Sequence, residues 1–235
     1  MKFRLLPNSK NRLLASLPEQ VYKQLRPSLE QVSQSFKQTL QEPDVIMSYV
    51  YFPLTTVVSI LVPMDDGSQI EVATVGNEGM VGLPVFLGSD TMQTISIVQI
   101  SGEALRIPAD TFKEAFGTME PFRNVLQLYT QALFMLTAQT AACNRVHDIA
   151  QRCARWLLIT HDRVETDRFP LTQEFLADML GVRRAGVSEV ASALQREGLI
   201  QYSRGVITVL DRSGLEARSC ECYQIIRQEF ERSFG

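Results

Sequence analysis

The stretch FPLTQEFLADMLGVRRAGVSEVASALQREGLI occupies residues 169–200 and decides the fold of the C-terminal part of the chain. Thr172 can cap a helix by accepting a backbone N–H of the first turn, and Gly181 can end that helix. A second helix begins about four residues later, and its apolar residues recur at helical spacing at Val187, Val190, Ala191 and Leu194. Two short helices joined by a turn that contains glycine predict a helix-turn-helix, whose second helix can enter the major groove of DNA.

Two adjacent arginines, Arg183 and Arg184, stand at the start of the second helix. An arginine can donate two hydrogen bonds to a guanine edge, which favours the right base by about 1–3 kcal/mol. Because a cation at a helix N-terminus opposes the helix dipole, a nearby anion would relieve a cost. The alternative interpretation is that the two arginines only form a solvated surface. We predict DNA contacts from Thr172, Gln173, Arg183, Arg184, Ala185, Ser188 and Glu189, with Thr172 and Gln173 on the phosphate backbone.

The sequence after this helix predicts a β-hairpin. LIQYS (199–203) and VITVL (206–210) are rich in β-branched residues and flank Arg204-Gly205. A hairpin directly after a recognition helix is the wing of a winged helix. Arg204 at its tip is therefore expected to reach a backbone phosphate.

A long helix is predicted upstream, beginning near Pro121, which suits a first helical turn. Mostly apolar residues recur along this helix at alternating steps of three and four. Such a seam is typical of a helix that pairs with a copy of itself. A core helix is the alternative, because Leu126, Leu133 and Leu136 lie beside the seam. The predicted dimerisation seam consists of Val125, Leu128, Ala132, Met135, Gln139, Ala142 and Val146.

The N-terminal half is predicted to be mainly β-structure. Short helical patterns in residues 9–32 precede a strand-like region from about residue 45 to 108, which includes VVSILV (57–62) and TISIVQI (94–100). Short strands at this spacing favour an antiparallel jelly roll. We expect an α+β fold with three parts: a β-roll sensor domain (1–118), a dimerisation helix (119–146) and a winged helix-turn-helix domain (147–235).

Composition restricts the remaining possibilities. The 235 residues carry a formal net charge of −3, which argues against indiscriminate nucleic-acid binding. We expect a cytoplasmic protein, because the chain has neither a secretory signal nor an apolar run long enough to span a membrane. Cys220 and Cys222 form a weak metal motif without a second pair or a histidine nearby in sequence, and Cys143 and Cys153 are expected to pack as small apolar groups. We therefore expect no metal and no cofactor.

With these motifs in hand, the chain resembles the family of the cyclic-AMP receptor protein and the fumarate-nitrate regulator (Crp/Fnr). Residues 169–200 match the helix-turn-helix of that family without a gap, and VATVGNEGMVGLPVFLG (72–88) is similar to its sensor domain. The resemblance implies a homodimeric transcription regulator that binds double-stranded DNA at a two-fold symmetric operator and works with RNA polymerase. It also implies that Arg184 reads guanine and that Ser188 reads a base.

The chain departs from the family at several of its functional positions. Glutamate and arginine are usual where Ala185 and Glu189 stand, so the operator is expected to differ from either family consensus. The nucleotide-binding glutamate and arginine-serine pair are replaced by Leu83 and by Gln93-Thr94, so cyclic AMP is not expected in the usual pose. No cysteine precedes Cys143, which removes the iron–sulfur ligands of the fumarate-nitrate branch. The effector is left open.

Two other classes of protein were weighed. A cupin-like enzyme would need several histidines on its strands, and residues 45–108 contain none, so an enzyme is not expected. A sensor that uses its winged helix to bind a protein partner remains an alternative, because Glu174, Asp178 and Glu189 lie near the arginines.

Overall fold

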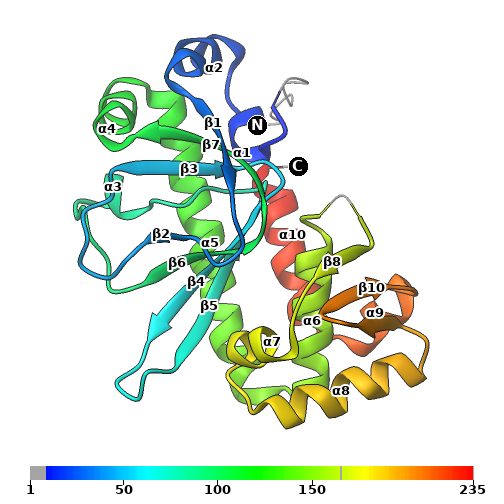
Figure 1. Ribbon diagram of the computed structural model, residues 1–235. Coiled ribbons are helices and arrows are strands. Elements are labelled where there is room, and N and C mark those ends of the chain that lie inside the picture. The colour runs from blue at the N-terminus through cyan, green and yellow to red at the C-terminus, as the bar shows by residue number, and fades with distance from the viewer. Residues whose placement is uncertain (1–8, 165, 235) are drawn as a thin grey trace.

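The computed structural model describes residues 9–164 and 166–234 (Figure 1). Its N-terminal part is a roll of two antiparallel sheets, with strand orders β1-β7-β3 and β2-β6-β4-β5. The strands are β1 (Glu30–Gln34), β2 (Thr39–Gln41), β3 (Tyr49–Pro53), β4 (Val57–Pro63), β5 (Gln69–Val75), β6 (Ile95–Ile100) and β7 (Gly102–Pro108). The helices around them are α1 (Arg12–Ala15), α2 (Glu19–Leu25), the 3-10 turn Arg26–Ser28, α3 (Pro84–Leu87) and α4 (Ala109–Thr118).

The β-structure begins earlier than the sequence pattern indicated. β1 and β2 lie before residue 45, where no β-branched run marks a strand. β1 reads EQVSQ and is an edge strand whose side chains are mostly exposed, so its polar composition is compatible with pairing on one side only. The two stretches named as strand-like form strands as predicted, since VVSILV lies in β4 and TISIVQI, apart from Thr94, in β6.

The long helix α5 (Glu120–Val146) runs behind the β-roll. The glycine-rich loop 76–82 packs closely against this helix, because a Cβ on Gly79 would lie 2.5 Å from the Tyr129 ring. The Tyr129 hydroxyl donates to the Met80 carbonyl at 2.7 Å. Gly76 makes equivalent room for Arg163, since a Cβ there would lie 2.6 Å from that side chain. These glycines therefore allow Tyr129 of α5 and Arg163, which follows α6, to lie close to the glycine-rich loop.

A bend at His147 separates α5 from α6 (Ile149–His161), and Asp148 forms a capping box that starts α6. The winged helix follows with β8 (Arg168–Pro170), α7 (Gln173–Leu180), α8 (Arg184–Arg196), β9 (Ile200–Ser203) and β10 (Val206–Val209). The strands pair in the order β8-β10-β9. At the hairpin tip both Arg204 (φ 51°) and Gly205 (φ 73°) are left-handed, as a two-residue type I′ turn requires.

Two C-terminal helices complete the chain, α9 (Arg212–Arg218) and α10 (Cys222–Phe234). α10 returns along α5 toward the β-roll (Figure 1), so that Phe234 meets the Tyr129 ring at a centroid distance of 6.4 Å. No helix among the described residues is long and apolar enough to cross a membrane.

Candidate nucleic-acid interface

The helix-turn-helix is formed by α7 and α8. The Thr172 hydroxyl oxygen accepts the Phe175 N–H at 3.1 Å and caps α7, while Gly181 (φ 62°) ends that helix in the left-handed conformation. Arg183 precedes α8, and Arg184 is its first residue. Val187, Ala191 and Leu194 are buried beneath α8, which fixes the opposite face of the helix toward solvent.

That outward face carries the residues predicted to contact DNA. Arg183, Arg184, Ala185 and Glu189 are exposed, and Ser188 is half-buried. In the described part of the chain, no carboxylate lies within ion-pairing distance of Arg183 or Arg184, whereas Arg163, Arg212, Arg218, Arg227 and Arg232 of this domain each have such a partner. Ser192 and Arg196 lie on the same face, one and two turns further along α8. The sequence-based prediction of DNA contacts did not include them, although they follow Ser188 at helical spacing.

The remaining predicted contacts flank this helix. Thr172 is exposed at the start of α7, with Gln173 half-buried beside it. Arg204 is exposed at the wing tip, and the Gly205 carbonyl accepts the Leu171 N–H at 2.8 Å, which joins the tip to the residue before Thr172. The start of α7 and the wing tip are thus held next to each other.

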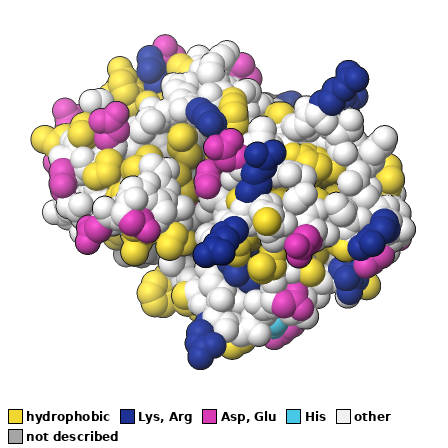
Figure 2. Space-filling model, turned by 60° about the horizontal axis from the view of Figure 1, so that its bottom comes forward, with side chains coloured by type: hydrophobic (Ala, Val, Ile, Leu, Met, Phe, Trp, Pro, Cys, Tyr) yellow, Lys and Arg dark blue, Asp and Glu magenta, His cyan; other side chains and the backbone are white. Residues whose placement is uncertain are grey.

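Figure 2 looks onto the end of the molecule at which α8 lies in Figure 1. Lys and Arg side chains stand out in the centre and on the right of this face, where acidic side chains lie among them, and further acidic side chains lie on the left.

The predicted dimerisation seam lies on two different sides of α5. Val125 and Ala132 are buried within the chain, and Gln139 Nε2 donates to Cys222 Sγ of α10 at 3.1 Å. These three residues do not face outward, because the β-roll and α10 cover their side of the helix. The other four seam residues are exposed, and so is Phe134, with 71% of its surface accessible. The exposed stripe of α5 consists of Leu128, Gln131, Phe134, Met135, Ala138, Ala142 and Val146.

The positions that replace the family's nucleotide ligands are occupied by other contacts. Leu83 is partly buried and packs against the hydrophobic core. Gln93 donates from its side-chain amide to the Asp44 carboxylate, and Thr94 is half-buried beside it. A carboxylate therefore stands beside the position at which a cyclic phosphate would need a cation.

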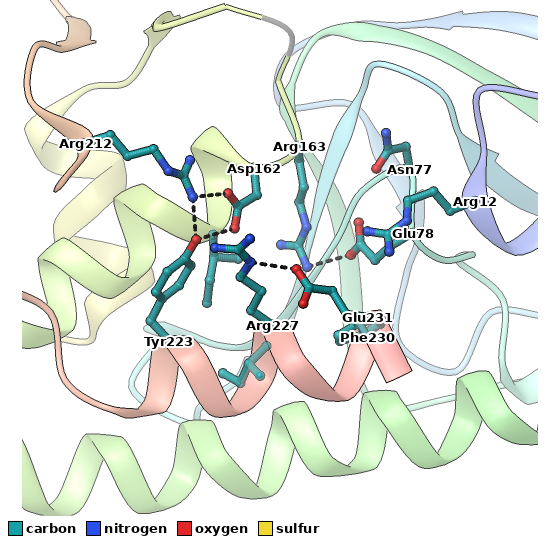
Figure 3. Close-up of a pocket in the computed structure, with 12 residues that line it drawn as sticks. Arg12, Asn77, Glu78, Asp162, Arg163, Arg212, Tyr223, Arg227, Phe230 and Glu231 are labelled. Carbon is teal, nitrogen blue, oxygen red and sulfur yellow. Dashed lines mark hydrogen bonds and ion pairs between the residues drawn. The ribbon is translucent and has the colours of Figure 1, made fainter. Parts of the chain in front are cut away.

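A cavity of about 400 Å³ lies where the β-roll meets α6, α9 and α10 (Figure 3). The buried pair Arg163–Glu78 (2.6 Å) joins α6 to the glycine-rich loop, and Arg212 binds both Asp162 and the Tyr223 hydroxyl. The cavity is lined by four arginines and three carboxylates, so cationic groups exceed anionic groups by one. The arginines are Arg12, Arg163, Arg212 and Arg227. Sequence reasoning missed this cavity because its residues come from five separate segments.

The four residues Cys143, His147, Cys220 and Cys222 lie together near the end of α5, with one ligand-type atom of each within 4.8 Å of all the others. Cys220 and Cys222 have no second cysteine pair and no histidine nearby in the sequence, but they do have a thiol and a histidine nearby in space. Folding brings Cys143 and His147 to them across more than 70 residues of chain.

Comparisons with known proteins agree with this architecture. The profile described as the Crp-like helix-turn-helix domain matches residues 151–218. No curated protein matches the sequence. A crystal structure of a Crp/Fnr-family putative transcriptional regulator from Eubacterium rectale is similar, with 20% identity, a TM-score of 0.68, and coverage of 87% of this chain and 96% of that one.

Two further solved structures share the fold. FixK2 from Bradyrhizobium japonicum has 17% identity and a TM-score of 0.70, with 82% of this chain and 98% of that chain covered. The c-di-GMP-responsive regulator CLP of Xanthomonas campestris has 17% identity and a TM-score of 0.64, with 82% and 99% covered. Residues 151–218 therefore form a Crp-like helix-turn-helix domain, and the chain has the fold of Crp/Fnr transcriptional regulators, as the resemblance in its sequence predicted.

Proposed function

We propose that the chain is a sequence-specific DNA-binding transcription regulator, and not an enzyme, that acts in the cytoplasm as a homodimer on a two-fold symmetric operator with RNA polymerase as a further partner. The observation that carries the proposal is the outward face of α8, on which Arg183 and Arg184 have no carboxylate partner in residues 9–164 and 166–234. Unpaired arginines at a helix N-terminus match the demands of a DNA groove, which supplies both phosphate oxygens and guanine edges.

The residues divide by the part of DNA that each can reach. Arg184 reads a guanine, and Ala185, Ser188 and Glu189 face the neighbouring bases. Thr172, Gln173 and Arg204 hold the phosphate backbone, because the N-terminus of α7 and the wing tip are joined through the Leu171–Gly205 hydrogen bond. Arg183 precedes the helix and contacts phosphate.

Dimerisation uses the exposed stripe of α5. Leu128, Phe134 and Met135 give this stripe large apolar side chains, while Ala138 and Ala142 allow close approach of a second helix. This assignment retains Leu128, Met135, Ala142 and Val146 of the predicted seam and rotates its centre toward Phe134. A dimer places two copies of α8 on one duplex, as a palindromic operator requires.

The effector is not cyclic AMP in the usual pose. Leu83 offers no polar group for a ribose, and the Asp44 carboxylate bound to Gln93 would repel a phosphate. The arginine-lined cavity between the β-roll and α10 is better suited to an anion, because Arg12 has no ion-pair partner among the described residues.

The test is a selection of random duplexes at fixed salt by wild type, Arg184→Ala and Arg183→Ala. Arg184→Ala is expected to cost about 1–3 kcal/mol at the cognate site and to relax preference at one base pair per half-site. Arg183→Ala should weaken all sequences alike and reduce the salt dependence. Arg232→Ala, an exposed arginine of α10, is the matched control and should change neither. An unchanged motif from the Arg184 variant would refute the base-reading role.

A winged helix that binds a protein partner is the second candidate, favoured by exposed Glu174, Asp178 and Glu189 beside the arginines. Electrophoretic mobility shifts with genomic fragments across salt concentrations separate the two. DNA binding predicts a shift whose affinity falls steeply with salt, whereas a protein-binding surface predicts no specific shift at any salt concentration.

A further inference from the structure

The cluster of Cys143, His147, Cys220 and Cys222 has the chemistry and the dimensions of a metal site. The sulfur atoms of Cys143 and Cys220 are 3.5 Å apart, and Cys222 Sγ lies 3.6 Å from His147 Nδ1. A tetrahedral zinc ion with Zn–S bonds of about 2.3 Å and a Zn–N bond of about 2.0–2.1 Å places its ligand atoms about 3.5–3.8 Å apart. We propose that these four residues bind one zinc ion in a closed Cys₃His site.

The environment of the three thiols differs from that of core cysteines. Cys143, Cys220 and Cys222 are buried, yet they form a cluster of their own that is separate from the main hydrophobic core. Cys153, by contrast, packs within that core. Cysteines that only fill apolar space would belong to the main hydrophobic core, as Cys153 does, and would not gather around one point.

The histidine is already oriented for a metal. His147 Nε2 lies 3.2 Å from a carboxylate oxygen of Glu221, while Nδ1 points at Cys222. A carboxylate on one ring nitrogen holds the proton there and leaves the other nitrogen free as a ligand. Glu221 is the residue between the two cysteines of the Cys-x-Cys motif, so one short loop supplies two ligands and the partner of a third.

Neighbouring groups fit the charge of the filled site. Three thiolates and one neutral histidine around Zn²⁺ carry a net charge of −1. The buried Arg155 interacts electrostatically with Cys143, and its Nε has no hydrogen-bond partner within the part of the chain that the structure describes. The Gln139 amide donates to Cys222 Sγ, an acceptor that becomes stronger as a thiolate. All four ligand positions come from protein, which is typical of structural zinc and not of catalytic zinc.

The site joins segments that are far apart in the chain. Cys143 lies on the last turn of α5 and His147 is the residue that directly follows this helix, while Cys220 and Cys222 lie where α9 gives way to α10. A bound ion would fasten the end of α5, just before the bend into the winged helix, to the start of α10. Binding converts three thiols to thiolates and releases three protons to solvent.

The experiment measures zinc in the full-length protein, purified with a phosphine reductant and freed of loose metal by gel filtration. We expect about one zinc per chain by plasma mass spectrometry, and less than about a tenth of that in Cys143→Ser and Cys220→Ser. Cys153→Ala removes a buried cysteine outside the cluster and should keep its zinc. In circular dichroism melts, a chelator should lower the melting temperature of wild type and of Cys153→Ala but not that of the two zinc-depleted variants.

A second measurement needs no variant. Wild-type protein loaded with Co²⁺ should show the intense visible bands of tetrahedral cobalt and a near-ultraviolet thiolate charge-transfer band. Zinc-free wild-type protein after reconstitution under reductant would overturn the proposal. So would equal metal loss from Cys153→Ala and Cys220→Ser, an octahedral cobalt spectrum, or a Cys143–Cys220 disulfide in the reduced, zinc-supplied protein. No DNA is involved, so these results are independent of the proposed regulatory function.

Discussion

Replacing Glu71 by glutamine should remove a pH-dependent destabilisation from the contact between the β-roll and α6. Glu71 lies on β5 with 7% of its surface accessible, and one carboxylate oxygen accepts the indole N–H of Trp156 at 2.7 Å. Its second oxygen is buried and has no hydrogen-bond partner in residues 9–164 and 166–234. Burial raises the pKa of Glu71 from 4.5 to about 7, although Ser59, Trp156, Arg155 and Arg163 act in the opposite direction.

The sign of the effect follows from the protons bound in each state. Below pH 4.5 the carboxyl is protonated in both the folded and the unfolded chain, and the stability is fully present. Between pH 4.5 and about 7 only the folded chain keeps the proton, so rising pH lowers the free energy of unfolding. At about 1.4 kcal/mol for each pKa unit, the whole loss amounts to about 3 kcal/mol. Above pH 7 it is complete, because the folded chain then holds a buried carboxylate.

Urea unfolding at about pH 5 and about pH 8 measures this loss. Wild type should lose about 2–3 kcal/mol more stability between the two pH values than Glu71→Gln does. Glu114→Gln, an exposed glutamate of α4, is the control and should follow wild type. Trp156 is the single tryptophan of the chain, so its fluorescence should titrate with a midpoint near 7 in wild type and lose that step in Glu71→Gln. Parallel stability curves for wild type and Glu71→Gln would refute the reasoning.

Three further outcomes follow from the geometry. Phe134→Glu should yield monomers by sedimentation velocity and abolish operator binding, whereas Leu87→Glu, at another exposed apolar position, on α3, should stay dimeric. A dimeric Phe134 variant would exclude the exposed stripe of α5 as the interface. Cyclic AMP should leave the melting temperature unchanged, although a ligand at 100 times its dissociation constant would add about 2.7 kcal/mol, so a clear upward shift would contradict this expectation. Gly79→Ala should destabilise the fold by about 1–3 kcal/mol in urea unfolding, because the new Cβ would lie 2.5 Å from the Tyr129 ring, and an unchanged midpoint would show that the loop can move away.

The winged helix could be predicted in detail because its determinants are local. Thr172 caps α7, Gly181 adopts the left-handed conformation that ends it, and Arg204-Gly205 forms the hairpin turn. Each of these residues acts on backbone groups only a few positions away, so the sequence around it contains the whole cause. The strands with β-branched alternation were predictable for the same reason, and the polar edge strand β1 was not.

The parts that could not be predicted depend on contacts between distant segments. Glu71 meets Trp156 across 85 residues, and Cys143 meets Cys220 across 77. Neither sequence environment indicates its partner. The four-residue spacing of Cys143 and His147 was a usable clue, because residues at this spacing share one face of a helix. The clue gains meaning only once the loop before α10 is known to lie against that face.

Contacts between distant segments also explain why the predicted dimerisation seam combines residues from two sides of α5. The repeating apolar positions along α5 include residues that face α10 and the β-roll as well as residues that face solvent. A helix that is covered on several sides is apolar on several sides. α10 covers the side of α5 that carries Gln139 and Cys143, and the glycine-rich loop 76–82 covers the side that carries Tyr129. In the proposed dimer, a second copy of the chain would therefore approach along the remaining exposed side, whose centre is Phe134. The C-terminal helix thus selects which face of α5 is left for a partner, and a change that detached α10 would expose a second apolar face and weaken that selection.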